Sequence, residues 1–483
     1  MNEKLTLSLF CAAIATAGSA AFAQSSLVDP TFDPGTGPTN GIVETVLPQP
    51  DGKVLVCGNF TAFNGVSQGY IARLNNDGSV DPSFHAGPGY WVRHMALQSD
   101  GKIVVGGFFT NVEGQPRNRV ARLNSDGSLD SSFDPGLGAE KKIVEGDPTD
   151  PFVFAVAVQP DGRIVIAGNF LTYNGVPRRG IARLNSDGSL DTSFNIGAGF
   201  DSWGRFLLLL PNDQILATGW MTHYDNQLFN RMVRLNSDGT AEKSFNPFFG
   251  DKTAVYGAVL LPNGQFIVGG HSVNDQGLFH REFERLNQDG SVDTNYAANA
   301  NEKVESIYLQ PDGKIIIGGY FSFVNGTSRN GLARINPDGS LDDNFQADTD
   351  NFVWTVRGQA DGKVLVCGGF TTVGGVSRPG VARLLTGVSG NTGDGGGSGG
   401  SGSSGDGSGT PIPPQLLQPA MDHGQFSVVV PTVAGSQYVL QSRDLDSDRW
   451  LSLPAVLGDG TNMKLLDPGT ASSSGRIYRV RVN

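Results

Sequence analysis

The sequence predicts an all-β fold: a seven-bladed β-propeller closed by an N-terminal strand, followed by a flexible linker and a small C-terminal β-sandwich-like domain. Three observations predict it. The stretch IARLNNDGSVDPSF at residues 71–84 returns along the chain at nearly constant intervals. A second stretch, QPDGK at residues 49–53, returns with the same intervals. The last copy stops one strand short, and a matching strand stands ahead of the first copy.

The repeat is anchored on one arginine in each copy. The steps between these arginines are 49, 61, 51, 51, 49 and 49 residues, and the QPDGK-type anchors follow the same steps. Two anchors that agree in this way indicate an array in which each copy is one supersecondary unit. The arginines are Arg73, Arg122, Arg183, Arg234, Arg285, Arg334 and Arg383.

Each copy has the pattern of four short strands. In the first copy we expect them at residues 42–49, 53–60, 70–75 and 80–84. The sequences Pro-Asp-Gly, Asn-Gly and Asn-Asp-Gly separate them, and their Gly and Asn residues supply the positive φ that tight hairpins require. No helical periodicity appears between these turns, so the array is expected to be all-β.

The third turn fixes the register of the last two strands. A three-residue loop that ends in Gly pairs Asn75 with Ser79, which sets Arg73 opposite Asp81. We expect a structural cross-strand ion pair at this place in every copy, each contributing up to ~1 kcal/mol. The predicted pairs are Arg73/Asp81, Arg122/Asp130, Arg183/Asp191, Arg234/Glu242, Arg285/Asp293, Arg334/Asp342 and Arg383/Asp29.

The seventh pair requires the ring to close. Residues 28–32, VDPTF, match residues 80–84, whereas the chain turns to Gly and Ser soon after Leu384. If residues 28–32 pair with residues 381–384, Asp29 faces Arg383 and no sheet edge stays exposed. The alternative is an open β-solenoid, which would have no use for a split last unit.

The repeat resembles a known family. The pattern QPDGK[IV], then an Asn-Gly turn, then ARLNxDGS[LV]DxSF, over about residues 27–385, is similar to the delta-60 repeat of bacterial secreted and surface propellers. Copies four and five depart most, since Asn212-Asp213 and Asn263-Gly264 replace Asp-Gly and Ala241-Glu242 replaces Leu-Asp. The resemblance implies a propeller and export, but no agreed activity and no catalytic residues.

Residues 1–23 have the pattern of a signal peptide. Lys4 is followed by an apolar run at residues 5–18 and by Ala21-Phe22-Ala23, the small-x-small form of a cleavage site. The alternative is a buried first strand or helix. We therefore expect a secreted or cell-surface protein, without a transmembrane segment once the leader is removed. A net charge of -12, with Lys and Arg spaced singly, argues against nucleic-acid binding.

The predicted domains are the propeller at residues 24–385, a Gly/Ser-rich linker at residues 386–410 and a small β domain at residues 411–483. The linker cannot bury apolar surface and is expected to be a flexible tether. Tyr438, Trp450 and Tyr478 are candidates for a small core in the last domain, where adhesion or sorting roles stay open.

Two cysteines, Cys57 and Cys367, follow the leader, and they share one small position of the repeat. We expect packed thiols there; the alternative is a disulfide, which the sequence does not decide.

Function is best sought where the copies differ. In a propeller the first strand of each blade lines the central channel, and the strand 2–3 and strand 4–1 connections share one face, the top face. Five residues before each QPDGK-type anchor lies a variable position, which we expect at the channel mouth. Aromatic rings with charged groups suit a sugar or a peptide, and the alternative is a solvated rim. The candidate ligand-binding residues are Glu44, Arg93, Phe154, Arg205, Tyr256, Glu305 and Trp354.

The predicted function is that of an exported, non-enzymatic binding or scaffold protein whose top face engages a glycan or a protein. The alternative is a polysaccharide hydrolase or lyase that uses Glu44 and Glu305 as its carboxylate pair. We identify no nucleophile–base–acid set and no phosphate loop, and we predict no cofactor and no metal.

Weaker candidates lie on the same face. Histidines at positions 223, 271 and 280 have neighbouring aspartates but lack a metal-binding spacing. Arginines of the top loops, at positions 117, 178, 329 and 378, are candidates to bind carboxylates or are simply exposed. The loop at residues 134–151 is longer than its counterparts by about a dozen residues.

Overall fold

The computed structural model describes residues 27–140, 150–247, 252–272 and 282–387, and seven strands between residues 417 and 482. The predicted signal peptide, most of the predicted linker and residues 141–149 of the long loop lie outside the described residues. In the part that is described, the regular helix is a single 3-10 turn, Pro211–Asp213, and no helix could cross a membrane.

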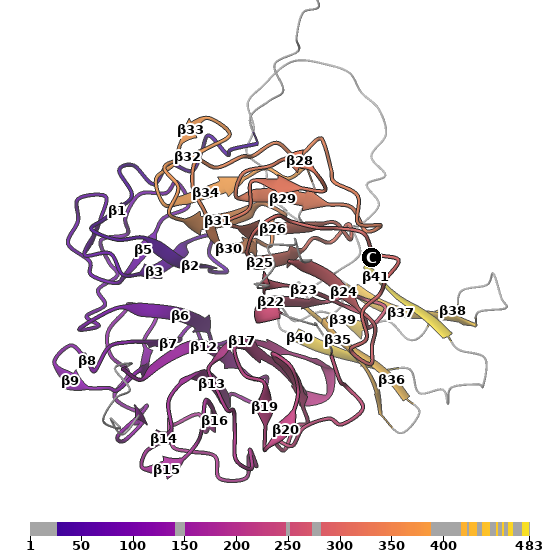
Figure 1. Ribbon diagram of the computed structural model, residues 1–483, viewed down its shortest axis with the longest axis horizontal. Helices are drawn as coiled ribbons and strands as arrows, with labels where there is room; N and C mark the ends of the chain where they lie inside the picture. Colours follow the sequence, from indigo (N-terminus) through magenta and orange to yellow (C-terminus); the bar gives the residue numbers. More distant parts are fainter. Residues whose placement is uncertain are drawn as a thin grey trace, which may run out of the picture.

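Seven three-stranded antiparallel sheets form the blades (Figure 1). The first strands are β2 (Val43–Pro48), β6 (Val92–Leu97), β12 (Phe152–Val158), β17 (Gly204–Leu209), β22 (Lys252–Leu260), β25 (Val304–Leu309) and β30 (Val353–Gly358). The second strands are β3 (Val54–Gly58), β7 (Ile103–Gly107), β13 (Ile164–Asn169), β18 (Ile215–Gly219), β23 (Phe266–Ser272), β26 (Ile315–Gly319) and β31 (Val364–Gly368). The third strands are β5 (Ile71–Leu74), β10 (Val120–Leu123), β16 (Ile181–Leu184), β21 (Met232–Leu235), β24 (Phe283–Leu286), β29 (Leu332–Ile335) and β34 (Val381–Leu384).

The blades form a closed ring. Each first strand contacts the first strand of the next blade, and β30 of the last blade contacts β2 of the first. Figure 1 shows these strands around a common centre, with the indigo first blade beside the orange last blade. The seven-bladed propeller predicted from the repeat is therefore confirmed, and the open solenoid is not observed.

Short hairpins and the segments that precede each blade build the top face. In the blades whose top connection is described, the chain between the second and third strands folds into a hairpin around a two-residue turn such as Asn174-Gly175, and the preceding segment pairs with that hairpin, as in the bridge Pro88↔Val112. These short strands are β1 (Pro38–Thr39), β4 (Ala62–Phe63), β8 (Asn111–Val112), β9 (Gln115–Pro116), β11 (Ala139–Glu140), β14 (Thr172–Tyr173), β15 (Val176–Pro177), β19 (His223–Tyr224), β20 (Gln227–Leu228), β27 (Phe323–Val324), β28 (Thr327–Ser328), β32 (Thr372–Val373) and β33 (Val376–Ser377).

The predicted fourth strand is shorter than expected. Leu74 and Val80 form an isolated bridge, in the predicted register, but residues 81–84 form a turn instead of a strand. The cause is Asp81, whose Oδ1 accepts hydrogen bonds from the Ser83 amide at 2.9 Å and the Ser83 hydroxyl at 2.7 Å. This local side-chain bond bends the backbone and ends the ladder.

The predicted cross-strand ion pair is one contact of a larger fork. Arg73 Nε donates to Asp81 Oδ2 at 2.7 Å, its Nη2 donates to Ser83, and its Nη1 donates to the Ser125 carbonyl of the next blade. The guanidinium also stacks over the Phe84 ring, 4.8 Å from the ring centroid. One arginine thus joins its own hairpin to the neighbouring blade, because each of its three nitrogens donates to an acceptor.

The arginine–carboxylate pair recurs around the ring with one exception, and the bond from Nη2 to a hydroxyl recurs in the second and seventh blades. The other close arginine–carboxylate pairs are Arg122/Asp130 at 2.6 Å, Arg183/Asp191 at 2.7 Å, Arg285/Asp293 at 2.8 Å, Arg334/Asp342 at 2.8 Å and Arg383/Asp29 at 2.8 Å. In the fourth copy the predicted pair Arg234/Glu242 is wrong. Glu242 Oε1 still accepts from the Ser244 amide, but the longer side chain does not bring a carboxylate oxygen to Arg234, whose Nε stays buried without a partner.

A second cation supports the carboxylate in most copies. Lys53, from the QPDGK anchor, lies 2.8 Å from Asp81 Oδ2, and Lys102 lies 2.9 Å from Asp130. The anchor therefore fixes both a turn and a charge, and the sequence analysis assigned it only the turn.

Ring closure uses the same contacts across the ends of the array. Val28 bridges Leu384, the Asp29 amide donates to the Arg383 carbonyl at 2.8 Å, and the two side chains pair as above. Arg383 is only 1% exposed and its Nη1 reaches Asn76 of the first blade. The Thr386 carbonyl accepts from Arg334, so the propeller's contacts extend one residue past the predicted boundary at residue 385.

The apolar core is divided into seven clusters, each between two adjacent blades. Cys57 and Cys367 belong to two of them and are free, fully buried thiols. The repeat position they share is small for a steric reason: at its counterpart Gly106, an added Cβ would lie 2.6 Å from a methyl group of Val153.

Beyond the propeller, the described strands pair into two sheets, β35-β36-β40 and one in which β37 pairs with β38, β39 and β41. Their bounds are β35 (Leu417–Asp422), β36 (Gln425–Pro431), β37 (Gln437–Asp444), β38 (Leu451–Ser452), β39 (Val456–Leu457), β40 (Asn462–Leu466) and β41 (Arg476–Val482). The sandwich-like domain stays a prediction.

Replacing Asp29 with Asn tests the closure. The amide keeps the acceptor for Thr31 but removes the charge facing Arg383, and an unpaired buried charge costs about 3–5 kcal/mol. We expect Asp29→Asn to lower the free energy of unfolding by this amount in urea titrations. Asp338→Asn is the matched control, because exposed Asp338 caps Ser340 in the same way without an ion pair, and it is expected to leave the free energy of unfolding essentially unchanged. Equal losses in the two variants would contradict closure by this pair.

The carboxylates of the forks predict acid sensitivity. Burial alone would raise the pKa of Asp29, but hydrogen bonds from Thr31 and the charge of Arg383 outweigh it and lower that pKa to about 2. In the same way, Ser193 and Arg183 outweigh the effect of burial on Asp191 and lower its pKa to about 2. A depressed carboxyl pKa stabilises the fold fully above the unfolded value near 4, and this stability is lost as the pH falls toward 2. We expect the free energy of unfolding to fall between pH 4 and pH 2, less steeply in Asp29→Asn. The same value at pH 7 and pH 2 would contradict this.

Candidate functional site

All seven predicted channel-mouth residues occupy the same backbone feature. Each is the extra residue of a β-bulge in the first strand of its blade, where the register with the second strand shifts by one. A bulge turns its side chain out of the regular alternation of the strand, and the ladder is locally interrupted. The feature therefore aims one variable side chain per blade at the channel.

Where the ladder is interrupted, a threonine hydroxyl of the neighbouring blade donates a hydrogen bond to the carbonyl of the bulge residue. Thr355 Oγ1 donates to the carbonyl of Glu44 at 2.6 Å, and Thr45 Oγ1 donates to the carbonyl of Arg93 at 2.9 Å. The hydroxyl that follows one bulge thus holds the bulge of the next blade, which fixes where these charged side chains begin.

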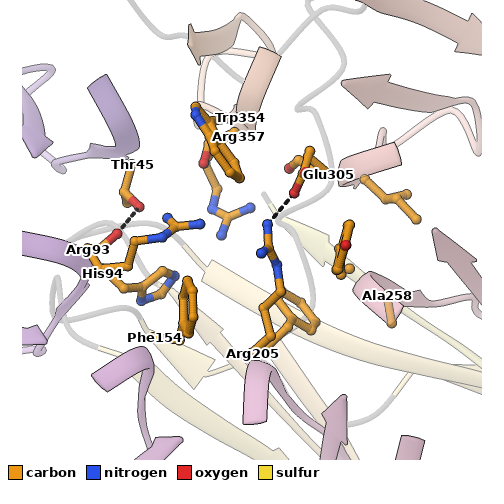
Figure 2. A pocket seen from close by; sticks show the side chains of 15 residues that line it. Thr45, Arg93, His94, Phe154, Arg205, Ala258, Glu305, Trp354 and Arg357 are labelled. Carbon is orange, nitrogen blue, oxygen red and sulfur yellow. Dashed lines mark hydrogen bonds and ion pairs between the residues drawn. The ribbon is translucent and has the colours of Figure 1, made fainter. Parts of the chain in front are cut away.

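The charged members of the ring pair with one another. Arg93 Nε lies 3.3 Å from Glu44 Oε2, which also accepts from the Trp91 indole at 2.9 Å. Arg205 forms an ion pair with Glu305 across the channel (Figure 2). Glu44, Arg93 and Glu305 are buried, so this ring is not the solvated rim that the sequence analysis gave as the alternative.

Burial shifts the ionisation of this cluster. It raises the pKa of Glu44 in spite of Arg93 and Trp91, and it lowers the pKa of Arg205 in spite of Glu305. His94, which also lines the channel, has a pKa lowered to about 3 by burial and by Arg357 and Arg93, so its imidazole is neutral near pH 7.

The aromatic members of the ring lie against the arginines. Arg93 stacks over Phe154 at 5.1 Å and Trp354 at 4.9 Å, and Arg205 stacks over Tyr256 at 4.0 Å. The structure therefore brings all seven predicted residues into one connected cluster. The space left between them is about 50 Å³, whereas pockets for organic ligands usually measure 300–1,000 Å³. A sugar ring does not fit between Glu44 and Glu305 in this arrangement.

A larger set of rings, most of them not predicted from the sequence, surrounds this cluster. Neighbouring rings lie 4.3–6.1 Å apart, in one continuous group that spans the second to fifth blades and in a smaller group at the sixth and seventh. Most are partly exposed, Tyr320 by 38%. We call the larger group the aromatic arc: Trp91, Phe108, Phe152, Phe154, Trp203, Trp220 and Tyr256. We call the smaller group the aromatic triad: Tyr320, Phe352 and Trp354.

Two columns of the repeat supply the missed rings. Trp91, Phe152, Trp203 and Phe352 stand two residues before the bulge, and Phe108, Trp220 and Tyr320 stand two residues after the small position of the second strand. Both columns lie at the top ends of strands, so aromatic enrichment in them was the signal available in the sequence.

Two equivalent grooves open beside these rings. One, of about 400 Å³, lies between the third and fourth blades and is lined by Asn169, Arg179, Asp201 and Trp203 among others. The other, of about 200 Å³, lies between the sixth and seventh blades and is lined by Tyr320, Asn330, Asp350 and Phe352 among others.

An aspartate supports each groove from the same position. Asp201 accepts hydrogen bonds from the amides of Thr222 and His223, and Asp350 accepts from those of Thr371 and Thr372. These bonds hold the groove wall to the neighbouring hairpin, so the groove is formed before any ligand arrives.

The weaker sequence candidates are not assembled into a site. His223 pairs with Asp201 at 3.0 Å and His271 lies 3.6 Å from Glu302, and residue 280 lies outside the described residues. Among the residues described, no three His, Cys, Asp or Glu side chains gather as metal ligands would. Arg329 and Arg378 are buried and face Asp343 and Asp33 of the protein itself, at 3.1 and 3.8 Å.

Several solved structures are similar to this chain at low identity. The extracellular domain of the hybrid two-component system BT4673 from B. thetaiotaomicron is 13% identical, with a TM-score of 0.46, over 89% of this chain and 47% of that chain. The WD40 β-propeller domain of Doa1 is 14% identical, with a TM-score of 0.45, over 74% and 96% of the two chains. The gluconolactonase XC5397 from Xanthomonas campestris is 14% identical, with a TM-score of 0.39, over 74% and 97%. This chain thus spans about half the length of the first of these structures.

Among curated proteins, no sequence matches this chain. A family model described as a domain of unknown function (DUF5122) beta-propeller matches it seven times, at residues 49–84, 98–133, 159–194, 210–245, 261–296, 310–345 and 359–387. Each match begins at a QPDGK-type anchor, and together they cover just over half of the chain. The chain therefore belongs to the DUF5122 β-propeller family, the family of the delta-60 type of repeat.

Proposed function

We propose that this protein is an exported, non-enzymatic binding protein whose top face binds a glycan. The observation that carries the proposal is the aromatic arc, because a continuous run of rings, most of them partly exposed, on a rigid scaffold offers flat apolar faces without a large entropic cost of ordering. Export is supported by the leader pattern at residues 1–23.

The groove at Trp203 is the proposed binding position. It joins a partly exposed ring of the aromatic arc to polar groups of Arg179 and Asp201, and its volume of about 400 Å³ is in the range of ligand pockets. A few polar groups beside an apolar wall give orientation and selectivity, which suits the alternating apolar and hydroxyl faces of a sugar. The equivalent groove at Phe352 is smaller and is proposed as a second, weaker position.

The charged cluster in the channel has a supporting role in this proposal. Arg93 and Arg205 contact rings of both the aromatic arc and the aromatic triad, for example Phe154 and Trp354. They hold the rings in place from below, and their pairing with Glu44 and Glu305 leaves the two carboxylates occupied. A role for those carboxylates in hydrolysis is therefore the less favoured function.

A glycan array with the purified mature chain tests the proposal. We expect binding to a restricted set of glycans, and Trp203→Ala is expected to weaken the best of them at least tenfold, since loss of a central aromatic anchor costs about 1.4 kcal/mol or more. Phe323→Ala is the matched control, because Phe323 is an exposed ring on an outer hairpin, 48% exposed and outside the aromatic arc. A blank array would contradict glycan binding by this face and favour a protein ligand. Equal losses in both variants would contradict the groove at Trp203 as the binding position.

A reducing-sugar assay on the same glycans separates binding from hydrolysis. We expect no product above the blank, and we expect Glu44→Gln to bind as the parent does, because Glu44 contacts Arg93 and Trp91 and does not line the groove at Trp203. Product formation that disappears in Glu44→Gln would instead establish the hydrolase.

A further inference from the structure

The inner cavity of the channel carries a surplus of positive charge. Three arginines line it, Arg93, Arg205 and Arg357, together with a single carboxylate, Glu305. Glu44 pairs with Arg93 from the adjacent position. Counting both carboxylates, these five side chains sum to one unit of positive charge.

Arg357 is the unbalanced member. Its Nη1 donates to the carbonyl of Val356 at 3.1 Å, and no ion pair with a carboxylate forms within the described part of the chain. The other two arginines each have a glutamate. Arg357 is partly buried. A partly buried guanidinium without a counter-charge favours an anion that comes from solution.

The three guanidinium groups converge. Figure 2 shows the ends of Arg93, Arg205 and Arg357 turned toward one another in the middle of the cavity. Burial is the main cause that lowers the pKa of Arg205; the charge of Arg93 lowers it further, whereas Glu305 raises it. Burial also lowers the pKa of Arg357. Like charges held together in this way are stabilised by a negative ion between them.

The size of the cavity limits what that ion is. About 50 Å³ is free between the lining residues, and one water molecule takes about 30 Å³ of liquid. A sugar acid or a nucleotide is too large. The remaining lining groups, such as His94 and Thr355, are uncharged near pH 7 and do not oppose an anion.

We propose that the channel holds a single inorganic anion of chloride's size between Arg93, Arg205 and Arg357. The ion balances Arg357 and ties the first strands of the second, fourth and seventh blades together, since each arginine comes from a different blade. This site is separate from the groove at Trp203, and its existence does not depend on glycan binding.

Thermal unfolding of the mature chain at constant ionic strength tests the site. With sodium gluconate, whose anion exceeds the cavity, exchanged stepwise for sodium chloride, we expect a saturable rise in Tm of about 3–6 °C. In Arg357→Leu the rise is expected to disappear. Leucine is native at this position of the repeat, as Leu47 and Leu208, so the variant is compatible with the strand. Lys243→Gln, which removes one exposed positive charge, is expected to keep the full chloride effect.

A second measurement on the parent protein keeps the test decisive if Arg357→Leu does not fold. The ³⁵Cl resonance of dilute chloride is expected to broaden in the presence of the protein and to narrow again when bromide is added as a competitor. Absence of broadening would overturn the proposal, as would equal Tm in chloride and gluconate. An unchanged chloride effect in Arg357→Leu would also overturn it, because it would place the ion elsewhere.

Discussion

The propeller depends on one arginine per blade, shared between two blades. Arg73 shows the arrangement: a carboxylate, a hydroxyl and a carbonyl accept from its three donor positions, and a ring covers its face. Apolar clusters between blades supply most of the burial, but they are not directional. The arginine contacts are directional. Arg73, Arg122 and Arg183 each donate to a carbonyl that lies three residues after the corresponding arginine of the next blade, which fixes how adjacent blades are aligned.

The sequence was sufficient to predict what is periodic. The loop length after Asn75 sets the register, and the constant step of the repeat is enough to predict that Asp29 lies opposite Arg383. Features that depend on competition between local hydrogen bonds could not be predicted from the repeat. Asp81 accepts from the amide of Ser83 as well as from Arg73, so it ends the strand in which it was placed. Glu242 is acidic like its counterparts, but one more methylene group was enough to separate it from Arg234.

The candidate site was only partly predictable for a different reason. The seven variable positions were identified because they share one column, and the structure brings them together at seven equivalent bulges. That they pair with one another instead of facing solvent depends on the radius of the ring, which no repeat pattern contains. Apart from Phe154 and Tyr256, the rings of the aromatic arc lie in columns where other copies have non-aromatic residues, such as Asn59, Lys303 and Gly369, so a search for what repeats passes over them. In such a fold the residues that match the repeat consensus build the propeller, and the residues that differ from it are the ones available for function.

Closure by the N-terminal strand has a consequence for how the molecule is made. Asp29 and Arg383 are 354 residues apart, so the bond between them cannot form until nearly the whole propeller has left the ribosome. Until then the last blade lacks its outer partner and the first residues have no sheet to join. The strands of each early blade are neighbours in the chain, so they can pair with one another soon after they are synthesised. The contact between the N-terminal segment and the last blade, which we call the seam, can form only at the end of synthesis. A chain truncated within its final blade would therefore leave both sides of the seam open to association with other chains.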